Sequence, residues 1–243
     1  MSSTQCTLDG FLGGRLTIAQ PKHGFRAGHD TVLLAAGVPA ETGSAVLELG
    51  AGAGAASLCL AARLGDVRVR GIEIDPELVA LANENAARNA MAGRVHFEVG
   101  DAAALGDAEE WDHVFFNPPF HPATGQQSPR LTRDRAMRDR CNAIGGWMRN
   151  ALALTRPGGT VTAMVRTDRV DDIVSVAEGH GARIVFPLFP RRGAVSKRSI
   201  VQIAKGRPGS LGVAVGLILH EADGRNTDAA EAVLRHGFQL RLA

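Results

Sequence analysis

The segment Asn117-Pro118-Pro119-Phe120 has the residue types needed to hold a planar exocyclic amine. The lone pair of such an amine is delocalised into its ring, so a catalyst must orient the nitrogen and accept its hydrogens. The side-chain oxygen of Asn117 and the carbonyl oxygen of Pro118 are suitable acceptors. The prolines restrict the backbone, and the ring of Phe120 can stack on a flipped-out base. The alternative interpretation is an ordinary proline loop after a strand.

A glycine-rich loop, Glu48-Leu49-Gly50-Ala51-Gly52-Ala53-Gly54, is the second candidate for ligand binding. It follows the apolar residues 45–47, which predict a buried strand. Alternating glycines allow a sharp turn and let a ligand lie against bare main chain. The loop has no lysine, which excludes a phosphate-binding P-loop. It does fit a dinucleotide fingerprint, so the loop alone does not separate NAD from S-adenosylmethionine.

Acidic residues at the ends of the next two predicted strands help to separate these two ligands. Residues 69–74 predict a strand that carries Glu73, whose carboxylate can accept both ribose hydroxyls of a nucleoside. The alternation over 95–99 predicts a further strand, after which Asp101 can accept from an adenine amine. Residues 114–116 then lead to the Asn117 tetrapeptide. Because ligands bind at the carboxyl ends of strands in open α/β sheets, this order predicts a nucleoside and an amine side by side.

The remaining patterns complete an α/β fold, a Rossmann-like seven-stranded, mostly parallel sheet with helices on both faces and a terminal antiparallel strand. Asp75-Pro76-Glu77 predicts an N-cap and a first helical turn, with Gly93 as the terminator of that helix. Residues 156–159 predict a turn. Further helices are expected over 55–64, 145–154, 168–178 and 228–236, and further strands over 160–165, 184–189 and 199–204, the last two forming a hairpin.

The composition indicates a cytoplasmic protein without membrane or metal partners. The 243 residues are 45% hydrophobic, enough for one substantial core, so we expect one domain. Residues 1–9 lack an apolar signal core, and no apolar run is long enough to cross a membrane. The three scattered cysteines give no disulfide framework, and the eight histidines show no paired metal-ligand spacing.

Basic residues are concentrated in two segments, although the net charge is only +2. Residues 183–207 contain seven basic and no acidic residues, and residues 121–140 contain five arginines against two aspartates. Both segments follow predicted strands, so they can lie near the Asn117 tetrapeptide and attract a phosphate backbone. The alternative is an arginine-rich solvated surface. The candidate RNA contacts are Arg130, Arg133, Arg191, Arg192, Lys197 and Arg198.

Together, these motifs resemble class I S-adenosylmethionine-dependent methyltransferases that modify exocyclic amino or amide nitrogens. The glycine loop and the Asn117 tetrapeptide support this resemblance to the superfamily. Within it, the chain is most similar to the bacterial valine-tRNA adenine-N6 methyltransferases. The segments RAGHDTVLLAA (26–36) and LHEADGRNT (219–227) support that closer resemblance, which spans about residues 10–237.

The resemblance implies a role for each matching residue. Residues 1–44 would cover the donor, 45–205 would form the catalytic core, and 206–243 would form a C-terminal tail. The catalytic loop would be residues 117–120, with Phe120 in a chain that has no tyrosine. Asp30 has an alternative role as a helix N-cap, and His29 as a solvated turn residue. The implied S-adenosylmethionine contacts are His29, Asp30, Glu48, Gly50, Ala51, Gly52, Gly54, Glu73, Ile74, Asp101, Ala102 and Asn117.

The favoured reaction is methyl transfer to an exocyclic amine, with adenine N6 of tRNA as the acceptor. Ribosomal RNA guanine-N2 methyltransferases share the tetrapeptide but often carry a duplicated domain. Protein-glutamine methyltransferases of release factors also share it, usually behind a helical N-terminal domain, whereas about 45 residues precede the glycine loop here. A non-catalytic nucleoside-binding or RNA-binding module is a further alternative. Sequence-specific DNA methylation fits least, because no recognition domain is visible. The sequence leaves the oligomeric state open.

Overall fold

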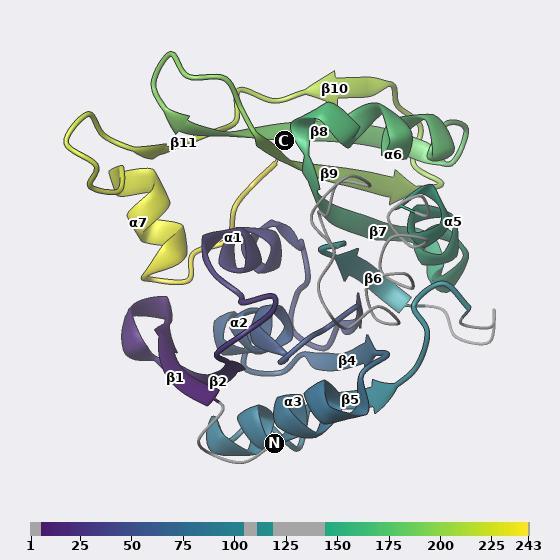
Figure 1. The fold of residues 1–243 in the computed structure, drawn as a ribbon. Coiled ribbons are helices and arrows are strands. Elements are labelled where there is room, and N and C mark those ends of the chain that lie inside the picture. Colours follow the sequence, from purple (N-terminus) through teal and green to yellow (C-terminus); the bar gives the residue numbers. More distant parts are fainter. Residues whose placement is uncertain (1–5, 105–110, 119–143, 243) are drawn as a thin grey trace.

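A mostly parallel sheet with helices on both faces dominates the computed structural model, which describes residues 6–104, 111–118 and 144–242 (Figure 1). The order of its seven central strands is β8-β9-β7-β6-β3-β4-β5, and β9 runs antiparallel to both of its neighbours. The predicted fold class is confirmed, including the antiparallel terminal strand. These strands are β3 (Ala45–Leu49), β4 (Arg68–Glu73), β5 (Val95–Val99), β6 (Trp111–Phe116), β7 (Thr155–Arg166), β8 (Gly181–Arg191) and β9 (Arg198–Lys205).

The helices form two layers, one on each face of the sheet. Val46 and Phe115 belong to the core beneath α1 (His29–Gly37), α2 (Ala55–Arg63) and α3 (Pro76–Arg88). Leu47 and Phe116, the next residues along the same strands, belong to the core beneath α5 (Ile144–Leu154) and α6 (Val170–Val176). Successive strand residues point to opposite faces, so β3 and β6 each contribute to both cores. Within the described residues, no helix has the length and apolar character needed to cross a membrane.

Helix α3 begins as the sequence predicts but ends earlier. The Asp75 side chain accepts a hydrogen bond from Glu77 N at 3.0 Å and caps the helix, while proline occupies the first turn. The predicted terminator Gly93 is wrong. The helix ends at Arg88, and Ala90 adopts a left-handed φ of 56°. Met91 N then donates to Ala86 O at 2.8 Å, the bond of a Schellman motif, so the backbone reverses before the glycine.

Two regions differ from the sequence-based prediction by adding strands. Near the N-terminus, β1 (Cys6–Phe11) and β2 (Leu16–Pro21) form an antiparallel hairpin around the short 3-10 helix η2 (Leu12–Gly14). In the tail, β10 (Leu211–Val213) and β11 (Leu217–His220) both pair in parallel with β8. The tail ends in α7 (Asp228–Leu234), inside the predicted 228–236 helix and capped by the side chain of Thr227.

The segment around β7 also departs from the prediction. The turn expected over 156–159 is wrong, because these residues lie inside β7 as a bulge: Trp111 pairs with Thr155, whereas His113 pairs with Thr160. Gly158 has a φ of +81°, which suits glycine at this irregularity. The single helix expected over 168–178 is divided into the 3-10 helix η3 (Thr167–Arg169) and α6.

Candidate functional site at the carboxyl edge of the sheet

Strand register brings the predicted motifs to one edge of the sheet. Leu49 of β3 pairs with Phe116 of β6, so Gly50 and Asn117 are the first residues beyond two adjacent parallel strands. Neighbouring strands lie about 4.8 Å apart. On the other side of β3, β4 ends at Glu73, which pairs with Val99 of β5. The glycine loop, Glu73 and the residues after β5 therefore follow Asn117 in a row along this edge.

The glycine loop turns sharply and leaves one open position. Gly50, Gly52 and Gly54 have φ values of 71°, 57° and 83°, which side chains rarely allow. A Cβ atom on Gly50 would lie 2.7 Å from the ring of Trp147, and one on Gly54 would lie 2.6 Å from Phe97. A Cβ atom on Gly52 would meet nothing within 4 Å. The outer glycines therefore allow close packing, whereas Gly52 faces space that a ligand can fill.

Glu73 lies at the end of β4 and touches this open part of the loop. Its Oε2 accepts a hydrogen bond from Gly52 N at 2.9 Å, and its Oε1 accepts from Ile74 N at 2.8 Å and Asp75 N at 3.0 Å. The carboxylate is thus held by backbone donors, and each oxygen has further lone-pair capacity. The Ile74 side chain is 42% exposed beside it. This geometry suits an acid that accepts hydroxyl hydrogens.

Asp101 and Ala102 follow β5 on the same edge. Asp101 Oδ1 accepts a hydrogen bond from Ala103 N at 3.0 Å, which forms a local turn. Ala102 is buried, and its carbonyl oxygen accepts from Asn150 Nδ2 of α5 at 2.5 Å. Sequence reasoning did not identify Asn150, because an asparagine inside a predicted helix carries no motif. It holds the turn that presents these two residues.

Asn117 has an unusual environment for a polar side chain. Its Oδ1 atom is buried and has no hydrogen-bond partner within the described residues. The next residue, Pro118, is buried as well. Pro119 and Phe120, which complete the predicted catalytic loop, lie outside the described residues, as do Arg130 and Arg133. Among the described residues, a buried acceptor without a partner therefore lies at the carboxyl end of β6.

Glu48 lies beneath the loop and is almost fully buried. Its Oε2 accepts from Ser57 N at 3.1 Å and from the Ser57 hydroxyl, both at the start of α2. Burial raises the pKa of Glu48 to about 8; the Ser57 bonds oppose this shift, and the nearby charge of Glu73 adds to it. The predicted cofactor ligand Glu48 thus bonds to the helix that follows the loop.

His29 and Asp30 begin α1, near the ends of β9 and β11. Gly28 occupies the N-cap position, so the alternative interpretation of Asp30 as an N-cap is wrong. The Asp30 carboxylate instead accepts from Arg198 Nε at 3.1 Å. His29 contacts the ring of His220, with the ring centroids 6.2 Å apart. A predicted cofactor ligand and a predicted RNA contact are therefore partners of one another.

The other described basic candidates lie at the connection between β8 and β9. Arg191, Arg192 and Lys197 are all exposed, and Gly193 turns the chain with a φ of 76°. Ser196, in the same connection, is buried and donates to Arg198 O at 2.7 Å. Among the residues that the structure describes, no group of three or more His, Cys, Asp or Glu side chains is arranged to hold a metal ion.

Comparisons with known proteins agree with this architecture. Residues 26–135 match the family model described as methyltransferase small domain. A tRNA1(Val) (adenine(37)-N6)-methyltransferase of Aeromonas hydrophila is 27% identical over 230 residues, which cover 90% of this chain and 92% of the relative. The enzyme of that name from Yersinia enterocolitica is 33% identical over 147 residues, or 59% of this chain, and the match spans only 56% of that relative.

A solved structure extends the similarity to the fold. The predicted O-methyltransferase Atu636 from Agrobacterium tumefaciens superposes with a TM-score of 0.70 at 23% identity, covering 87% of this chain and 97% of that one. The family model and the curated relatives support one activity, S-adenosylmethionine-dependent methyl transfer, and the solved structure agrees with the fold. The chain is similar to relatives whose names specify N6 of adenine 37 in tRNA1(Val).

Proposed function

We propose that this chain transfers a methyl group from S-adenosylmethionine to an exocyclic amine of RNA, with adenine N6 of a tRNA as the acceptor. The observation that supports this most is the buried Asn117 Oδ1, which has no partner in the described part of the chain. A buried polar atom without a hydrogen bond costs about 1–3 kcal/mol. An amine hydrogen of a substrate would satisfy Asn117 Oδ1 and recover that free energy.

The donor fits the neighbouring loop. Open space at Gly52 allows a nucleoside to approach the main chain, and Glu73 beside it has lone pairs for ribose hydroxyls. Asp101 and Ala102 would bind the adenine, while His29 and Asp30 would approach from the start of α1. When bound, S-adenosylmethionine supplies a methyl group that its sulfonium charge has already activated. The glycine loop and Asn117 lie on adjacent strand ends, so both substrates can bind side by side.

Asn117 and Pro118 would act by orientation. The Asn117 side-chain oxygen and the Pro118 carbonyl would each accept one hydrogen of the amine, leaving the nitrogen facing the methyl group. Holding two reactants in a productive geometry can supply about 7–11 kcal/mol of a barrier. Pro119 would stiffen this loop, and Phe120 would stack on the base. After methyl transfer the nitrogen would release one proton to solvent, so this role needs no general base.

RNA as the substrate is supported by charge as well as by the relatives' names. Arg191, Arg192 and Lys197 are exposed at the β8–β9 connection, and β8 ends at the same edge of the sheet as β6. We propose that these residues bind the phosphate backbone, with Arg198 supporting them from its pair with Asp30. Arg130 and Arg133 remain candidate contacts from the sequence.

We also propose that residues 1–243 form one domain. Helix α7 of the tail caps the core beside α1, and Leu240 N donates to Ala36 O at 2.9 Å. The hairpin β1–β2 packs on α3 through hydrogen bonds to Asn85 and Asn89. The first and last described segments are therefore both joined to the central sheet and its helices.

The proposal is tested with radiolabelled S-adenosylmethionine and unmodified tRNA. We expect label in the RNA and, after digestion to nucleosides, N6-methyladenosine. Label in N2-methylguanosine would instead indicate a guanine-N2 methyltransferase, and label in an added release factor would indicate a protein-glutamine methyltransferase. Donor binding without transfer to any of these acceptors would favour a non-catalytic module.

A further inference from the structure

We infer that Asn85 of α3 is a positioning residue for the donor loop. Asn85 is completely buried. Its Nδ2 donates to Ala53 O at 3.0 Å and to Ala19 O at 2.9 Å. Its Oδ1 accepts from Ala19 N at 2.8 Å and from Arg88 Nη1 at 2.6 Å. Both amide hydrogens and both lone pairs are thus used, and one side chain joins the glycine loop to the N-terminal hairpin.

Asn89 makes the same contact with the hairpin one helical turn later. Its Nδ2 donates to Thr17 O at 2.9 Å, and its Oδ1 accepts from Thr17 N at 3.0 Å. Residues four apart in a helix rise about 6 Å, and residues two apart in a strand advance about 6.6 Å. This match allows both asparagines to pair with the backbone of β2. Within the described residues, the hydrogen bonds of Asn89 do not reach the glycine loop, which makes it a natural control.

The contact with Ala53 lies at the part of the loop where a ligand would bind. Ala53 stands between Gly52 and Gly54, both in the left-handed region. Gly52 N is held by Glu73 Oε2, and Gly54 N by Ala51 O at 2.9 Å. Because a peptide unit is planar, fixing Ala53 O also fixes the orientation of the following N–H group. Glycines restrict the backbone weakly, so these bonds preorganise the loop and reduce the entropy lost on donor binding.

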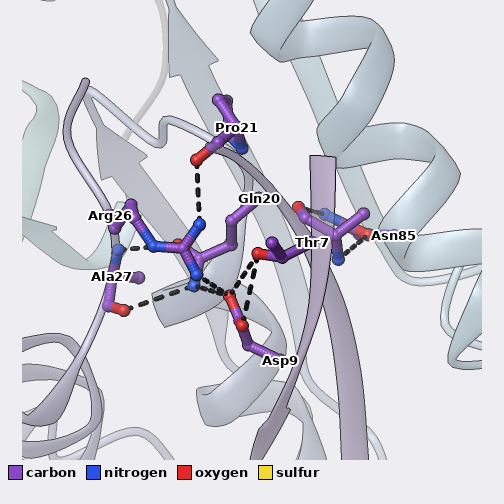
Figure 2. A network of polar contacts seen from close by, with 8 residues as sticks. Thr7, Asp9, Gln20, Pro21, Arg26, Ala27 and Asn85 are labelled. Carbon is purple, nitrogen blue, oxygen red and sulfur yellow. Dashed lines mark hydrogen bonds and ion pairs between the residues drawn. The ribbon is translucent and has the colours of Figure 1, made fainter. Parts of the chain in front are cut away.

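The hairpin also holds the segment that leads to α1, as Figure 2 shows. Gln20, next to Ala19 in β2, accepts from Ala27 N at 2.7 Å and donates to Asp9 Oδ2 at 2.7 Å. Arg26 pairs with the same Asp9 oxygen at 2.5 Å. Through Ala19 and Gln20, Asn85 therefore connects the glycine loop to the chain immediately before His29. This inference rests on donor binding at the proposed site.

The test compares three variants by calorimetric titration with S-adenosylmethionine and by steady-state kinetics. We expect Asn85→Ala to raise the donor Kd and the donor KM about tenfold, the effect of one lost hydrogen bond. At saturating donor, kcat and the KM for RNA should stay unchanged. Asn89→Ala should leave the donor Kd within about twofold of the native value. Val233→Ala, in the buried face of α7, provides a destabilised control with an unchanged donor Kd.

Two results would overturn the inference: native donor affinity in Asn85→Ala, or donor affinities that fall in proportion to stability in all three variants. If Asn85→Ala does not fold, Asn85→Asp replaces it, because Asp keeps the acceptor for Ala19 N but cannot donate to Ala53 O when ionised. Native protein without any donor binding would overturn the proposed function as well. A native protein that binds donor, with an Asn85 variant that binds equally well, would overturn only the inference.

Discussion

The two ends of the parallel sheet differ in whether a buried side-chain oxygen lacks a hydrogen-bond partner among the described residues. At the amino end lies a hollow of about 510 Å³, lined by residues that include Arg68, Arg94 and Trp111. At the carboxyl end, a buried acceptor on Asn117 has no partner among the described residues, and Gly52 faces open space. A binding site is expected where a buried polar atom still lacks a hydrogen-bond partner. We therefore propose that the active site lies at the carboxyl end of the sheet and not at the amino-end hollow.

Polar groups near the amino end are used to hold the fold. Asp112 accepts from Ala45 N at 2.7 Å and pairs with Arg156 at 2.5 Å. His113 Nδ1 contacts Thr160 Oγ1 at 2.8 Å, and burial lowers the pKa of His113 to about 4. Arg94, which lines the hollow, donates to Leu64 O at 2.9 Å. These groups tie neighbouring strands together and need no ligand.

Of the substitutions that compare the two ends of the sheet, Asn117→Ala should have the largest effect on methyl transfer. Removing the acceptor should lower kcat for methyl transfer about 100- to 1000-fold, as for the loss of one transition-state hydrogen bond. The donor Kd should rise by no more than about tenfold, the effect of one lost donor contact. Arg68→Ala, at the amino-end hollow, is the control and should leave both values near native. Labelled-methyl transfer and calorimetry measure these effects, and similar losses in both variants would refute the distinction.

Glu73→Gln should have the next largest effect, on donor affinity. The substitution keeps the size of the side chain but removes the charge, and it places the amide NH2 group against the backbone donor of either Gly52 or Ile74. We expect the S-adenosylmethionine Kd to rise about 10- to 100-fold. Glu98→Gln, which loses only an ion pair with Arg70, is the matched control. Equal donor affinity in the two variants would exclude Glu73 from the donor site.

The contributions of buried titratable groups at the two ends to folding stability should change with pH in opposite directions. Glu48 has its pKa raised from 4.5 to about 8 by burial, so the folded protein loses stability as the pH rises through this range. His113 has its pKa lowered to about 4, so its contribution is lost as the pH falls below about 6.5. Between pH 6.5 and 8, the free energy of unfolding of the native protein should fall by about 1–2 kcal/mol. In Glu48→Gln it should not show this fall.

Urea unfolding across this pH range measures the difference between native protein and Glu48→Gln. Glutamine can still accept from Ser57, so the variant should keep the contact with α2. Parallel stability curves for the two proteins would show that Glu48 does not titrate as its burial implies.

The smallest effect is expected for RNA binding. Arg191→Ala with Arg192→Ala should weaken RNA binding several-fold and reduce the slope of log K against log salt by about 1–2. Arg68→Ala with Arg207→Ala removes the same charge from exposed positions toward the amino end and should leave the slope unchanged. Equal slopes in the two double variants would indicate attraction by net charge alone.

The sequence predicted which motifs meet at one edge of the sheet, because strand order determines which residues lie side by side. In parallel strands, the residues after each strand lie at one edge, so the positions of Asn117, Gly50 and Glu73 followed from their places in the chain. The fold class followed from the same alternation of strands and helices. Asp30 and Arg198 are 168 residues apart, and no pattern in the sequence indicates that they pair.

Other features were missed because they leave no pattern. Asn85 is polar and lies in an amphipathic helix, so only the packed structure shows that it is completely buried and bonded to the glycine loop. Strand β10 has three exposed residues and therefore lacks the buried alternation that predicts a strand. The hairpin β1–β2 depends on α3 for part of its pairing, and such contacts between distant segments are not visible in the sequence.

The most direct test of the account is a crystal structure of the protein with S-adenosylhomocysteine and an adenosine-containing RNA. We predict the nucleoside of S-adenosylhomocysteine against Gly52 with its ribose hydroxyls on Glu73. The 6-amino group of the acceptor adenine in the RNA should lie within hydrogen-bonding distance of Asn117 Oδ1. A cofactor bound in the amino-end hollow, or an acceptor adenine of the RNA whose 6-amino group lies away from Asn117, would contradict the proposal that the carboxyl edge is the active site.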